Sequence, residues 1–115
     1  SFSVWSGNDD MAVPVISLGG QGVISVLSNI MPRETHDMCR LCLEGDYKSA
    51  AEMQLRYLRL INSLFIEVNP IPVKEAMNIL GFEAGAPRAP LTVIENANRD
   101  KLKTAMENFG LECKA

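Results

Sequence analysis

The sequence of 115 residues contains no apolar run near the roughly 18–20 residues that a membrane-spanning helix requires. No signal peptide is visible either, so we expect no membrane partner. With 11 basic and 14 acidic side chains the formal net charge is -3, and no global positive field attracts nucleic acid. The sequence also has no internal repeats and no low-complexity segments.

Cysteine is scarce, with only Cys39, Cys42 and Cys113 in the chain. An odd number without a secretion signal favours reduced thiols, which predicts a cytoplasmic protein. His36 precedes the first two cysteines at three-residue steps, a spacing that resembles a metal site. Steps of three residues drift by about 60° around a helix, and no fourth ligand lies nearby. We therefore expect packed thiols, no metal and no cofactor.

The chain begins Ser1-Phe2-Ser3-Val4-Trp5, with polar and apolar residues alternating as if within a strand. A natural start normally carries Met and a polar lead-in. We interpret the chain as a fragment, or as one piece of a cleaved protein.

The first part of the sequence has a strand–helix–strand pattern. Residues 2–5 predict a short strand, and the Asn-Asp-Asp at 8–10 offers capping oxygens and negative charge to a following helix. The glycine pair at 19–20 predicts the end of that helix. Residues 22–26 are apolar and β-branched, as is typical of a strand in a parallel sheet. Such a βαβ unit has a right-handed crossover and needs further strands as neighbours.

After Ser28-Asn29 the sequence becomes helical throughout. Pro32 suits a helix start, and Gly45 predicts its end before Asp46 caps the next helix. That next helix carries apolar residues at spacings of three and four, which predicts one buried stripe. The stripe comprises Tyr47, Ala50, Ala51, Leu55, Leu58, Ile61, Leu64 and Phe65. Two further helices are expected near 72–80 and 97–108, each ending at a glycine.

The pattern predicts an α/β fold: the last βαβ of a (β/α)8 TIM barrel followed by a mainly α-helical C-terminal region. We place the end of the barrel in residues 1–45 and the helical region in residues 46–115. The pattern by itself also fits a piece of an open α/β sheet.

Three blocks carry a resemblance to a known family: Ser-Gly-Asn-Asp-Asp at 6–10, Gly-Gly-Gln-Gly-Val-Ile-Ser-Val at 19–26, and Asn-Pro-Ile-Pro-Val-Lys at 69–74. In this order they resemble the carboxyl-terminal part of the dihydrodipicolinate synthase family of pyruvate-dependent aldolases and lyases. The third block is the most specific. Pro70 ends one helix, and Pro72 suits the first turn of the next.

The resemblance implies a Schiff-base lyase that condenses pyruvate with L-aspartate 4-semialdehyde to 4-hydroxy-tetrahydrodipicolinate, on the path to diaminopimelate and lysine. In the family, the glycine matching Gly7 lines the second-substrate pocket. The isoleucine matching Ile24 offers its backbone carbonyl near the Schiff-base lysine. That lysine belongs to an earlier strand, before Ser1, so we expect no catalytic residue here and an inactive fragment. The resemblance also implies tetramers of complete barrels, formed with the missing N-terminal part.

Several alternatives stay open. By pattern alone Gly7 is a turn glycine and Ile24 a core residue. Lys74 is a candidate nucleophile, but it lies just inside a helix, where we expect packing or a surface pair. The rival functions are a related lyase acting on N-acetylneuraminate or a keto-deoxy sugar acid, a non-catalytic helical interaction module, and a pseudo-enzyme with a regulatory role.

Overall fold

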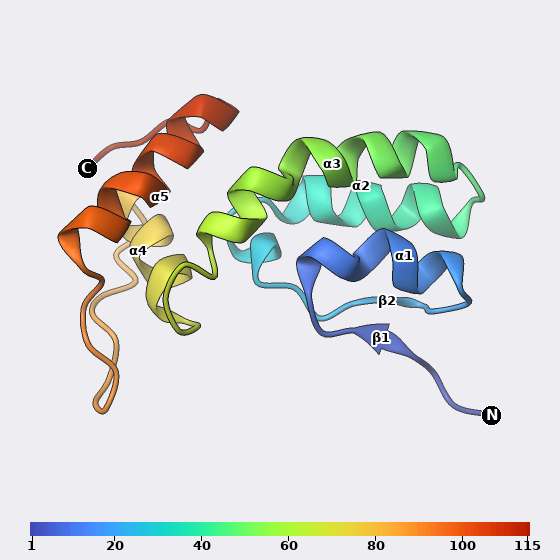
Figure 1. Cartoon of the computed structure of the whole chain (residues 1–115), viewed down its shortest axis with the longest axis horizontal. Coiled ribbons are helices and arrows are strands. Elements are labelled where there is room, and N and C mark those ends of the chain that lie inside the picture. Colours follow the sequence, from blue (N-terminus) through green and yellow to red (C-terminus); the bar gives the residue numbers. More distant parts are fainter. The chain divides into compact units, whose positions relative to one another are not determined.

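The computed structural model describes residues 1–115 and contains two short strands, two 3-10 helices and five α-helices (Figure 1). In chain order they are β1 (Trp5–Ser6), η1 (Asp9–Met11), α1 (Ala12–Ser17), β2 (Gly22–Val23), η2 (Leu27–Asn29), α2 (Pro32–Leu43), α3 (Tyr47–Ser63), α4 (Ile71–Ile79) and α5 (Asn96–Phe109). The chain divides into two compact units, Ser1–Leu58 and Arg59–Ala115. None of the helices combines the length and the apolar character needed to cross a membrane.

The first unit begins with the predicted strand–helix–strand arrangement. β1 and β2 are parallel neighbours, with Trp5 opposite Gly22 and Ser6 opposite Val23. The α/β class and the parallel pairing are therefore confirmed. The ladder is shorter than the strands expected at 2–5 and 22–26. Each strand has one neighbour in this chain, so the remaining residues have no second backbone with which to form a ladder.

Two glycines end the first helix as the sequence predicted. Gly19 has a φ of 103°, which favours glycine because other residues are strained there. Gly20 is required by close packing, since a Cβ at this position would lie 2.7 Å from the carbonyl oxygen of Val15. The Gly20 N–H donates to the same oxygen at 2.9 Å. The chain can therefore turn tightly from α1 into β2.

α2 and α3 run in opposite directions because Gly45, with a φ of 89°, reverses the chain between them (Figure 1). The predicted cap of α3 is confirmed, since Asp46 Oδ1 accepts the Ser49 N–H at 3.1 Å. Hydrogen bonds from Ser49 hold the pKa of Asp46 below its ordinary value.

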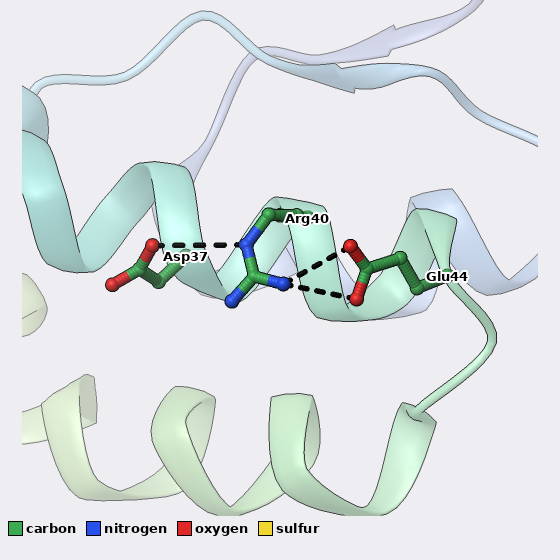
Figure 2. A network of polar contacts seen from close by, with 3 residues as sticks. All are labelled: Asp37, Arg40 and Glu44. Carbon is green, nitrogen blue, oxygen red and sulfur yellow. Dashed lines mark hydrogen bonds and ion pairs between the residues drawn. The ribbon is translucent and has the colours of Figure 1, made fainter.

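On the surface of α2, Arg40 donates two hydrogen bonds to Glu44, at 2.9 and 3.0 Å, and lies 3.9 Å from Asp37 (Figure 2). All three side chains are well exposed. Such a network contributes less than about 1 kcal/mol because water screens it. The network therefore lies on the exposed surface of α2 and does not determine how the helix packs.

The buried face of α3 differs from the predicted stripe. Leu55 is 71% exposed, whereas Tyr57 is buried and so is the polar Gln54. The amide of Gln54 donates to the Asp9 carbonyl at 3.0 Å and accepts the Val13 N–H at 3.2 Å. The prediction was wrong here because it counted apolar residues only. A glutamine whose hydrogen bonds are satisfied by backbone can occupy a buried position.

In the second unit α4 and α5 supply most of the buried side chains. These are Ile71, Pro72, Val73, Ala76, Ile79, Leu102 and Met106. Both helices lie within two residues of their predicted bounds, and Gly110 ends α5 with a φ of 102°. The Lys114 N–H donates to the Ile79 carbonyl at 2.7 Å, which joins the C-terminal segment to the end of α4.

Polar side chains also join α4 and α5 and the segments beside them. Glu75 accepts from the Arg99 Nε at 2.6 Å, and both side chains are partly buried. Glu67 accepts the Glu95 N–H and the Asn98 side-chain amide, each at 3.0 Å. Glu67 thus satisfies a donor at the start of α5 from outside that helix.

The two compact units meet within α3, after Leu58. The boundary after residue 45 predicted above has a different basis, because it marks the expected end of a complete barrel. The first division describes contacts within this chain, and the second describes the expected complete barrel. The barrel boundary stays a prediction.

Candidate functional site

The two predicted site residues lie together at one edge of the small sheet. Gly7 follows β1 directly and Ile24 follows β2 directly. The Ile24 N–H donates to the Ser6 carbonyl at 2.8 Å, which joins the two strand ends. In parallel α/β folds the loops at the carboxyl ends of the strands carry the chemistry. Both residues therefore lie at the edge of the sheet where such loops begin, and their role in a site stays a prediction.

Neither the backbone conformation nor the packing within this chain requires glycine at position 7. Gly7 does not have a positive φ, and a Cβ built at this position would meet no heavy atom within 4 Å. Gly20 and Gly22 differ, since a Cβ at either would collide with Val15 or with the Trp5 ring. A requirement for glycine at position 7 would come from something outside this chain, such as a ligand approaching the backbone.

Ile24 is not a core residue in this chain. Its side chain is 70% exposed, which corrects the interpretation from the apolar pattern alone. Phe2, Val4 and Trp5 are also exposed, at 50–89%. Exposed apolar side chains along a two-stranded sheet are typical of strands that lack their neighbours.

Asp9 has a role that the sequence did not reveal. Asn8 supplies no side-chain cap to η1, and Asp9 is only 1% exposed. Its carboxylate reaches across to the segment after β2, where it accepts the Ser25 hydroxyl. It also accepts the N–H groups of Val26 at 2.9 Å and Leu27 at 3.0 Å. The prediction of local helix capping was therefore wrong for Asp9, because a carboxylate satisfies any nearby donors and here these lie 16–18 residues further along the chain.

The segment after β2 is also ordered by its own serines. The Ser25 hydroxyl accepts the Ser28 N–H at 2.9 Å, and the Ser28 hydroxyl donates to the Ser25 carbonyl at 3.0 Å. On the β1 side, the Ser6 hydroxyl donates to the Asn8 carbonyl at 2.7 Å. Both strand ends therefore continue into loops held by short-range hydrogen bonds.

A hollow of about 290 Å³ lies beside β2 in the first unit. Its lining comprises Trp5, Gln21, Gly22, Val23, Ser25, Ser28, Pro32, Thr35, His36 and Cys39. Burial, with smaller contributions from Cys42 and Asp9, raises the pKa of the Cys39 thiol. The thiol is thus protonated and weakly nucleophilic at neutral pH.

The His36, Cys39 and Cys42 side chains occupy different environments on α2. Cys42 is buried, Cys39 is half-buried and His36 is exposed. This divergence follows from the drift of three-residue steps around a helix. No group of three or more His, Cys, Asp or Glu residues is arranged to hold a metal ion.

Lys74 lies in the first turn of α4 and is half-buried. Its backbone N–H donates to the Pro70 carbonyl at 3.0 Å, as part of the helix start. Nearby, a smaller hollow of about 140 Å³ lies between α4 and residues 85–94, with Glu75 and Asn78 in its lining. Lys74 is not among the residues that line this smaller hollow.

Comparison with known proteins identifies the family of this chain. The model of the dihydrodipicolinate synthetase family matches residues 1–109. The 4-hydroxy-tetrahydrodipicolinate synthase of Caldicellulosiruptor bescii is 55% identical over 113 residues, which cover 98% of this chain and 38% of that protein. The crystal structure of dihydrodipicolinate synthase from Aquifex aeolicus is 44% identical, with a TM-score of 0.95, and the match covers 100% of this chain and 39% of that one.

A third match is the chloride-inhibited dihydrodipicolinate synthase from Acinetobacter baumannii, complexed with pyruvate. It is 34% identical with a TM-score of 0.92, over 96% of this chain and 38% of that one. The chain thus spans about 38% of the length of its curated relatives and corresponds to their carboxyl-terminal portion. Since the family model matches almost all of it, this chain belongs to the dihydrodipicolinate synthetase family.

Proposed function

We propose that this chain is the carboxyl-terminal part of a Schiff-base lyase with a (β/α)8 barrel. The enzyme condenses pyruvate with L-aspartate 4-semialdehyde to 4-hydroxy-tetrahydrodipicolinate in lysine and diaminopimelate biosynthesis. The observation that carries the proposal is the shared sheet edge of Gly7 and Ile24. The name of the 55% identical relative and the pyruvate complex of the Acinetobacter baumannii enzyme support it.

In this reaction a lysine amine adds to the pyruvate carbonyl and water leaves, giving an imine. Loss of a methyl proton gives an enamine, whose carbon attacks the aldehyde of the second substrate. The lysine lies outside this chain, on an earlier strand of the barrel. This chain contributes pocket lining and scaffold, with residues 1–45 as the end of the barrel and 46–115 as the helical region.

Two residues of this chain face the substrates in the proposal. Gly7 lines the pocket of the second substrate, where the open space at its Cα admits the aldehyde close to the backbone. Ile24 presents its backbone carbonyl to the reacting lysine. Both act only with the rest of the barrel, which assembles as a homotetramer, so the 115-residue chain alone is inactive.

The test is intact mass spectrometry after incubation with pyruvate and borohydride, which reduces an imine to a stable amine. We expect a trapped pyruvyl group on the longer protein and none on the 115-residue chain. An adduct on the short chain would instead point to a lysine within it, with Lys74 examined first. If neither protein forms an adduct, the Schiff-base proposal is wrong.

A panel of second substrates then separates the related lyases. We expect turnover of pyruvate with aspartate semialdehyde and none with N-acetylmannosamine or a sugar aldehyde. The reverse preference would move this protein to a sugar-acid lyase with the same imine chemistry.

A further inference from the structure

Asp9 is a buried carboxylate that joins the two strand ends. It is 1% exposed, and its hydrogen-bond donors are the Ser25 hydroxyl and the N–H groups of Val26 and Leu27. These donors are neutral and come from three consecutive residues. Burying a charged group is unfavourable unless hydrogen bonds satisfy it, and bonds to a charged acceptor are stronger than those between neutral groups. The carboxylate thus fixes this segment more firmly than a neutral side chain would.

The residue fixed between these contacts is Ile24. Its N–H donates to the Ser6 carbonyl at 2.8 Å, and its C-terminal neighbour Ser25 is bound by Asp9. The Ile24 side chain is 70% exposed, so side-chain packing within this unit does not hold it. The direction of the Ile24 carbonyl therefore depends on hydrogen bonds on either side of it.

We propose that Asp9 is a positioning residue, which holds the Ile24 carbonyl in its working direction through Ser25 and Val26. The inference rests on the proposed function, in which that carbonyl faces the reacting lysine. Asp9 itself touches neither substrate nor lysine. Its loss slows formation of the pyruvate imine and affects the binding of the second substrate less.

Two substitutions disturb this arrangement to different degrees. In Asp9→Asn the side chain keeps its shape, and its remaining oxygen can still accept from Val26 and Leu27. An NH2 group cannot accept, so the Ser25 hydroxyl no longer donates to residue 9 and can only accept from the new amide, beside the Ser28 N–H that it already accepts. Ser25→Ala removes the bond to Asp9 from the other side, together with the acceptor of the Ser28 N–H, and Ser25→Thr restores the hydroxyl.

Two further variants serve as controls. Asp10→Asn makes the same charge change on the neighbouring residue of η1, whose side chain is exposed. Ile16→Val removes one methylene from a buried position in α1 and lowers stability without touching the Asp9 network. It shows how much activity is lost through destabilisation alone.

The experiment uses the complete protein and measures the rate of imine formation by rapid mixing with pyruvate and borohydride trapping. Steady-state kcat, both KM values and Tm are recorded for every variant. We expect Asp9→Asn and Ser25→Ala to slow imine formation on the order of ten-fold, because small misplacements in a site are costly. Asp10→Asn and Ser25→Thr should stay near the parent rate.

Three results would overturn the inference. The first is an unchanged imine rate in Asp9→Asn while the parent is active, which leaves the proposed function intact. The second is a loss of imine rate in Asp9→Asn that is no larger, for the same fall in Tm, than the loss in Ile16→Val. Asp9 would then be purely structural. The third is a parent protein that forms no imine, which removes the proposed function together with the inference.

Discussion

The two compact units of this chain differ in how far they satisfy their own backbone hydrogen bonds and bury their own apolar side chains. In Arg59–Ala115 the helices satisfy most of their own backbone groups, and polar pairs such as Glu75 with Arg99 join α4 to α5. In Ser1–Leu58 the ladder is two residues long and exposed apolar side chains flank it, including Phe2 at 89% and Ile24 at 70%. A helix closes its hydrogen bonds locally, whereas a strand needs neighbours. The unit that carries the candidate site is therefore the one that depends more on the rest of the protein.

The largest expected effect concerns the isolated 115-residue chain, which should aggregate or stay partly molten because its strands lack neighbours. Hydrogen exchange should show rapid exchange at residues 5–6 and 22–23 and slower exchange within α4 and α5. A sharp, reversible two-state melt of a monomer would contradict this prediction.

Removing a core side chain of the second unit should have the next largest effect. Leu102 is fully buried, so Leu102→Ala in the complete protein should lower the free energy of unfolding by about 2–5 kcal/mol. Leu55→Ala is the matched control, because Leu55 is 71% exposed and surface changes cost less than about 0.5 kcal/mol. Urea unfolding measures both. Equal losses would show that the remainder of the protein covers Leu55.

The same substitution at two glycines of the first unit should change stability to different degrees. A Cβ at Gly20 would lie 2.6 Å from a Val15 side-chain carbon and 2.7 Å from the Val15 carbonyl oxygen, so Gly20→Ala should destabilise by about 1–3 kcal/mol. Gly7→Ala meets open space and should leave Tm unchanged, while under the proposed function it raises KM for the second substrate. A fall in Tm with Gly7→Ala and no change in KM would place Gly7 among the structural turn glycines.

The polar pair of the second unit should matter more than the surface network of the first. Glu75 and Arg99 are 22% and 32% exposed, so Glu75→Gln should cost about 1 kcal/mol. Glu44→Gln, in the exposed network of Figure 2, should cost a few tenths at most. Thermal unfolding at two salt concentrations separates them, and a loss confined to Glu44→Gln would reverse the comparison.

The smallest effect should be the pH dependence of the α3 cap. Hydrogen bonds from Ser49 lower the pKa of Asp46 in the folded protein. A lowered folded-state pKa means that Asp46 stabilises the protein above its unfolded pKa of about 4 and that this stabilisation fades as the pH falls further. Asp46→Ala should therefore melt below the parent at pH 7, and the difference should shrink as the pH falls through the lowered folded-state pKa of Asp46. A difference in Tm that does not change with pH would exclude the charged form as the cause.

Local signals in the sequence predicted the helices well. Pro32, Gly45, Asp46 and Gly110 mark element ends through backbone chemistry that needs no distant partner. The strand–helix–strand pattern predicted the parallel strands, and the resemblance of the three blocks indicated the family. Local signals misjudged the buried face of α3, because the burial of Gln54 depends on backbone groups of residues 9 and 13.

By itself, the sequence determined the positions of the later helices, the Asp46 cap of α3, the α/β class and the position of Gly7 after the first strand. These follow from propensities and turn chemistry, which act over a few residues. Tertiary structure alone decided that Asp9 binds Ser25, Val26 and Leu27 and that Gly20 packs on Val15 without room for a side chain. A carboxylate can accept from many donors, and a glycine can pack against many neighbours. Folding selects among them by bringing separate segments of the chain together.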